Sequence, residues 1–120
     1  MDIRIKNLIQ LLEFKTINKD AIWTRTSGNN EFKIEFNNAT ITTDNWSIDG
    51  FPYYDFVILN ENGDAIERIS VNEEDNLAED YRIITNLYNI VKNNYFKVDE
   101  TIDNILFELN SNSKIGGNKK

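Results

Sequence analysis

Carboxylates, amines, hydroxyls and phenols are the side chains in this 120-residue sequence that could do acid–base or nucleophilic chemistry, because it contains no histidine and no cysteine. Histidine is the side chain that normally titrates near neutral pH, and thiols supply nucleophiles, disulfides and soft metal ligands. Enzymes that depend on either residue are therefore excluded. We expect no catalytic residues, no metal and no cofactor, and we interpret the chain as a non-enzyme.

Acidic residues are concentrated between positions 61 and 80, where eight carboxylates accompany one base, Arg68. Eight minus one equals the magnitude of the whole formal net charge, −7. Such a segment repels nucleic-acid phosphates and attracts a basic protein surface. A solvated face with acids at a helix N-terminus is the simpler alternative. The partner-binding candidates from this segment are Glu61, Asp64, Glu67, Glu73, Glu74 and Asp75.

The spacing of the carboxylates does not favour catalysis or metal binding. Glu73, Glu74 and Asp75 are consecutive, so they splay around a helix start, whereas a glycosidase needs two carboxyl groups facing each other across a cleft. The 60–64 loop offers oxygen ligands, but its glycine does not occupy the position that a calcium loop requires. A nucleophile elbow and a phosphate-binding loop are also absent from the sequence.

Aromatic residues cluster around the single proline, Pro52, and are the best candidates for recognition. Strand alternation places Tyr54 on one face of a strand and Tyr53 on the other. If Tyr54 belongs to the core, Tyr53 and Trp46 are left near the surface, where aromatic side chains with a polar group favour interfaces. The alternative is that the whole cluster packs under helices.

The hydrophobic pattern predicts the elements that position these residues. Residues 3–14 have helical periodicity, and strands are expected at 22–26, 31–36, 39–43, 54–59 and 65–71. Asn37-Asn38, Asp49-Gly50 and the 60–64 loop are turn signals. Two helices follow, with Asn72 and Asp99 as expected N-caps.

The fold class is therefore α+β: a five-stranded antiparallel meander with one N-terminal helix and two C-terminal helices packed on the sheet. In the last helix an apolar stripe is expected to face inward; it consists of Ile102, Ile105, Leu106 and Leu109. Residues 1–110 are expected to form a single domain, and residues 111–120 a flexible tail.

The chain resembles a group of short, largely uncharacterised bacterial and phage proteins. The resemblance rests on the N-terminal helix leading into Trp23-Thr24-Arg25-Thr26, the turn at Gly63-Asp64, and the segment from Val98 to Leu106. It implies the fold and a bacterial or phage origin, and it implies no activity.

We expect a cytoplasmic binding protein that neutralises or sequesters a partner with a basic surface, as immunity or phage counter-defence proteins do, or as a DNA-mimic inhibitor does. The acidic candidates, together with Trp46 and Tyr53, would form the contact. No direct nucleic-acid binding is expected, and the sequence has no apolar run long enough to span a membrane.

A sponge for a small nucleotide-type signalling ligand is the alternative. Tyr53 or Trp46 would stack the base, and Arg25, Arg68 or Arg82 would bind the phosphates. Because arginines are few, such a site would need residues from two subunits of a homo-oligomer.

Overall fold

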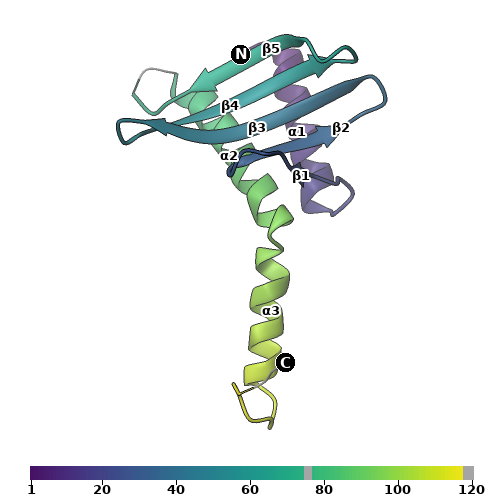
Figure 1. The fold of residues 1–120 in the computed structure, drawn as a ribbon, viewed down its shortest axis with the longest axis vertical. Coiled ribbons are helices and arrows are strands. Elements are labelled where there is room, and N and C mark those ends of the chain that lie inside the picture. Colours follow the sequence, from purple (N-terminus) through teal and green to yellow (C-terminus); the bar gives the residue numbers. More distant parts are fainter. Residues whose placement is uncertain (75–76, 118–120) are drawn as a thin grey trace.

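The computed structural model describes residues 1–74 and 77–117 and confirms the α+β class and the order of the elements (Figure 1). A five-stranded antiparallel sheet has its strands in sequence order, β1-β2-β3-β4-β5. The helices are α1 (Ile3–Ile17), α2 (Ala78–Tyr95) and α3 (Val98–Leu109). The strands are β1 (Thr24–Arg25), β2 (Glu31–Glu35), β3 (Ala39–Ile48), β4 (Phe51–Asn60) and β5 (Ala65–Val71).

Tight turns fix the register of the sheet. Asp49 and Gly50 connect β3 to β4 with φ angles of 53° and 85°, the two positive values that a type I′ hairpin turn requires. Asn37-Asn38 also forms the predicted turn, closed by a 2.8 Å hydrogen bond from the Phe36 N–H to the Ala39 carbonyl. The predicted turn residues therefore determine which side chains of β2, β3 and β4 face one another.

Helices α1 and α2 cover one face of the sheet and lie behind it in Figure 1. The core between these layers contains Ile9, Leu12, Trp23, Phe32, Phe56, Ile84, Leu87 and Val91. The two helices run parallel: Lys6 pairs with Glu79 near their beginnings, and the Asn94 side chain donates to the Thr16 carbonyl near their ends. Both helices therefore finish at the same end of the domain.

Helix α2 begins later than the sequence predicted. Its first residue is Ala78, so the prediction that Asn72 caps it is wrong. Asn72 instead accepts a 2.9 Å hydrogen bond from the Glu74 N–H, which is a local turn. Asp75 lies outside the described residues. The predicted cap of α3 is also wrong by two positions, because Lys97, in the left-handed conformation, precedes a helix that starts at Val98.

Helix α3 extends away from the rest of the domain and contains no buried residue (Figure 1). The expectation that it packs on the sheet is therefore wrong. Ile102, Ile105, Leu106 and Leu109 are 50–58% exposed and do not face the core. Helical periodicity correctly located an apolar stripe, but periodicity does not specify what covers the stripe. Among the described residues, no helix is both long and apolar enough to cross a membrane.

Candidate functional site

The face of the sheet opposite the helices carries the most concentrated set of polar and aromatic side chains. We call it the open face, and it is formed by the strand residues that point away from the helices: Glu31, Lys33, Thr42, Asp44, Trp46, Tyr53, Asp55, Val57 and Arg68. Every second residue of β2, β3 and β4 points here because side chains alternate across a strand. The sheet thus presents an apolar face to α1 and α2 and a charged face on its other side.

Three carboxylates lie side by side on the open face. Glu31 of β2 is directly opposite Asp44 of β3, and Asp44 is directly opposite Asp55 of β4. We call these residues the carboxylate row. Directly opposite side chains on one face have Cβ atoms about 4.5–5.5 Å apart, and like charges in such positions repel. The row therefore concentrates negative potential across three neighbouring strands.

The environment of Asp44 reflects this crowding. Partial burial raises the pKa of Asp44 above its ordinary value, the charge of Glu31 raises it further, and that of Asp55 adds a smaller increase. A hydrogen bond from the backbone of Asn45 acts in the opposite direction. The ionised form of Asp44 is therefore disfavoured in the folded protein, and a nearby cation would relieve that penalty.

The Asp55 side chain is 13% exposed. Its Oδ2 lies 3.9 Å from the Arg68 guanidinium, whereas its Oδ1 is buried and has no hydrogen-bond partner among the described residues. The indole N–H of Trp46 is likewise buried and without a partner. Most buried polar atoms in proteins are hydrogen-bonded, so an acceptor and a donor without partners on one face call for an explanation.

Trp46 and Tyr53 stack beside the carboxylate row. Their rings are 4.5 Å apart between centroids and inclined by 12°, and the two residues are opposite each other on β3 and β4. The prediction that Tyr53 and Tyr54 point to opposite sides is confirmed, since Tyr54 packs edge-on against Tyr81 and Tyr88 below the sheet. The stacked pair places two π systems next to the anionic row.

Further along the open face the sheet is hollowed, with a volume of about 400 Å³. The hollow is lined by residues that include Glu31, Asp55, Lys33 and Arg68, so both charge signs border it. Among the described residues, no group of three or more acidic side chains is placed to hold a single metal ion.

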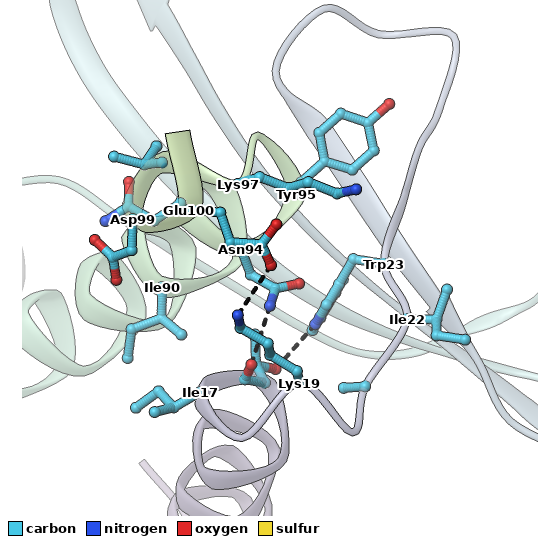
Figure 2. A pocket seen from close by; sticks show the side chains of 14 residues that line it. Ile17, Lys19, Ile22, Trp23, Ile90, Asn94, Tyr95, Lys97, Asp99 and Glu100 are labelled. Atoms are coloured by element: carbon cyan, nitrogen blue, oxygen red, sulfur yellow. Dashed lines mark hydrogen bonds and ion pairs between the residues drawn. The ribbon is translucent and has the colours of Figure 1, made fainter. Parts of the chain in front are cut away.

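A second hollow, of about 480 Å³, lies where the end of α1, the loop to β1 and the junction of α2 with α3 meet (Figure 2). Trp23 donates a 3.0 Å hydrogen bond to the Thr16 hydroxyl, and Asn94 bonds to the Thr16 carbonyl. Lys19 and Glu100 form a 2.9 Å ion pair at the same place, which raises the pKa of Lys19 and lowers that of Glu100. These polar groups already have partners, so we place the candidate site on the open face.

The acidic candidates from the sequence do not form one surface. Glu61 and Asp64 lie in the turn before β5, Glu67 lies on β5, and Glu73 and Glu74 follow it. All of these residues are exposed. The turn is separated from Glu73 by the seven residues of β5, which span about 23 Å. The acidic candidates therefore surround one edge of the sheet, whereas the carboxylate row crosses the centre of the sheet.

The residues of the alternative nucleotide site lie in three different parts of the chain. The Arg25 guanidinium lies 5.7 Å from the Tyr95 ring centroid and 5.3 Å from that of Phe96, near the edge strand β1. Arg68 is on the open face beside Asp55, and Arg82 is on α2, on the other side of the sheet. One copy of the chain does not assemble these arginines around Tyr53.

The sequence-based search missed Glu31, Asp44 and Asp55 as a group, although the signal was present. Two-residue turns at Asn37-Asn38 and Asp49-Gly50 imply that Glu31 faces Asp44 and that Asp44 faces Asp55. Runs of charge along the chain do not reveal charges that the sheet brings together across strands.

Comparison of the chain with protein-family models, with curated proteins and with solved structures found no match in any of the three. The geometry of the open face is therefore the basis for a functional proposal.

Proposed function

We propose that this protein is a non-enzymatic binding protein whose open face receives cationic side chains of a protein partner. The observation that carries the proposal is the carboxylate row, with the unpartnered Oδ1 of Asp55 beside the stacked Trp46 and Tyr53. An arginine or lysine satisfies both features, because it forms charge-assisted hydrogen bonds with carboxylates and stacks on aromatic rings.

A peptide chain fits the site better than a free cation does. Asp55 needs a hydrogen-bond donor and the Trp46 indole needs an acceptor. A partner that presents arginine or lysine next to its own backbone carbonyls supplies both at once. The arrangement thus favours a folded or extended polypeptide with a basic surface.

In the biological setting that we propose, the protein acts in the cytoplasm and neutralises its partner by covering that basic surface. Immunity proteins and phage counter-defence proteins work in this way, and DNA mimicry is a variant of it. The net charge of −7 supports the idea, since a strongly acidic small protein is steered toward a basic partner. Such a mechanism requires steric blocking and no chemical step.

A titration with a defined probe tests the proposal. The probe is a blocked peptide, acetyl-Gly-Arg-Gly-Arg-Gly-amide, and the readout is the pair of tryptophan indole N–H resonances in a ¹H–¹⁵N spectrum. We expect the Trp46 resonance to move and the Trp23 resonance to stay, because Trp23 is bonded to Thr16 in the core. A peptide with glutamate in place of arginine should leave both unchanged.

Two matched variants locate the contact. Asp55→Asn should weaken peptide binding at least tenfold at low salt, whereas the double variant Glu73→Gln and Glu74→Gln should bind within about twofold of the original protein, because these residues lie outside the open face. If the double variant Glu73→Gln and Glu74→Gln loses peptide binding and Asp55→Asn does not, the acidic edge of the sheet is the binding site. The proposal for the open face would then be wrong.

A further inference from the structure

Two helices of this protein carry apolar side chains on the surface. On α3, Ile102, Ile105, Leu106 and Leu109 form a stripe whose members are 50–58% exposed. On α1, the side opposite the core presents Leu11, Phe14 and Ile17, which are 62–69% exposed. A helix with apolar residues on two faces is generally covered by other protein surfaces on both faces. Among the described residues, the outer face of α1 has no such cover.

The two stripes do not meet within one chain. Helices α1 and α2 run parallel, and α3 begins where both end and then points away from them (Figure 1). Each stripe therefore needs a cover from outside the chain, and a second copy offers both covers at once.

The charges of the two helices decide which stripe pairs with which. Helix α3 contains Asp99, Glu100, Asp103 and Glu108 and no base. Helix α1 contains Arg4, Lys6 and Lys15 against a single acid, Glu13. Two α3 helices placed together would repel each other, whereas α3 against α1 brings opposite charges together.

We propose that the protein forms a two-fold symmetric dimer in which α3 of each copy lies on the outer face of α1 of the other. An antiparallel packing places the acidic first turn of α3 next to the last turn of α1, which contains Lys15. The same contact is made twice, as in any isologous interface. This proposal does not depend on the open face, which is on the opposite side of the helical layer.

Cross-linking tests the pairing directly, because the chain has no cysteine of its own. Two single variants, Phe14→Cys and Ile105→Cys, are mixed in equal amounts and oxidised. We expect disulfides between the two different variants in clear excess over those between identical ones. Preferential Ile105→Cys self-linkage would show that two α3 helices pair with each other, and this result would overturn the proposal.

Analytical ultracentrifugation of the full chain tests whether the dimer forms. We expect a mass of twice 14.0 kDa that dissociates on dilution. Ile105→Glu and Phe14→Glu should each weaken dimerisation at least tenfold, while far-UV circular dichroism shows that both remain folded. Phe107→Glu is the matched control, since Phe107 is 80% exposed on the other side of α3 and should leave the dimer intact. A monomer at all concentrations, or an equal effect of Phe107→Glu, would contradict the proposal.

Discussion

Replacing Asp44 by asparagine should stabilise this protein in the absence of a partner. Asp44 is the middle member of the carboxylate row and faces both Glu31 and Asp55. Burial and these two charges raise its pKa, so its ionised form destabilises the folded state. Asparagine has nearly the same shape and can still accept the hydrogen bond from the Asn45 backbone, but it carries no charge.

The expected size of the effect follows from the two cross-strand pairs. A pair of like charges directly opposite on a sheet destabilises by roughly 0.2–1 kcal/mol, so removing the charge of Asp44 should stabilise by about 0.4–2 kcal/mol near neutral pH. The pH dependence has a defined sign. Because the pKa of Asp44 is raised in the folded state, Asp44 holds its proton more firmly in the folded than in the unfolded protein just above pH 3.8, and its contribution to stability falls as the pH rises through that window.

Urea unfolding followed by circular dichroism at pH 7 and at pH 4 measures both effects. With a urea m-value of about 1–3 kcal/mol/M, a gain of about 1 kcal/mol raises the midpoint by roughly 0.3–1 M. The gain from Asp44→Asn should shrink at pH 4, where Asp44 is partly protonated in the original protein. Glu35→Gln is the control, because Glu35 lies opposite Thr40 and 3.5 Å from the Lys33 amine, without a facing acid. An Asp44→Asn variant no more stable than this control would refute the reasoning.

Three further predictions concern the scaffold. Thr16→Val should destabilise by about 1–3 kcal/mol in urea unfolding, since it leaves the buried Trp23 N–H without an acceptor; the loss should be smaller in a Trp23→Phe background. Burial raises the pKa of Tyr88 to about 12, so a spectrophotometric titration should show a late-ionising tyrosine that Tyr88→Phe removes. Stability should fall less steeply between pH 10 and 12 in Tyr88→Phe than in the original protein. Gly50→Ala should cost about 1–2 kcal/mol because Gly50 has a φ of 85°, whereas Gly28→Ala, at a position without a positive φ, should stay within about 0.5 kcal/mol in the same assay.

Local patterns predicted the sheet well because turn chemistry and strand alternation act over a few residues. The turn at Asp49-Gly50 requires positive φ at both positions, and once it is located, the pairing of Trp46 with Tyr53 follows by counting outward. The same counting predicts that Asp44 faces Asp55. That part of the candidate site was therefore accessible from the sequence, given attention to neighbours across strands.

The placement of the helices was less predictable because it depends on tertiary contacts. Asn72 followed by acids is a common sequence at a helix start, yet α2 begins only at Ala78, where the chain reaches the sheet face that α2 covers. The stripe of α3 has the same periodicity as that of α2, but α2 contains Ile84 and Leu87 in the core whereas α3 contains no buried residue. A periodic pattern identifies an apolar face, and it does not distinguish a core from an interface.

The two proposed surfaces have a joint consequence, because the helical layer separates them. The open face lies on one side of the sheet, and α1 with α2 lies on the other (Figure 1). A dimer built from α1 and α3 would bury the helical side and leave both open faces outward. Two cation-binding faces on one particle bind a multivalent basic surface more tightly than either face alone, through a raised effective concentration and without any new contact. The carboxylate row is expected to lower the stability of the free protein, as a surface that functions in binding commonly does.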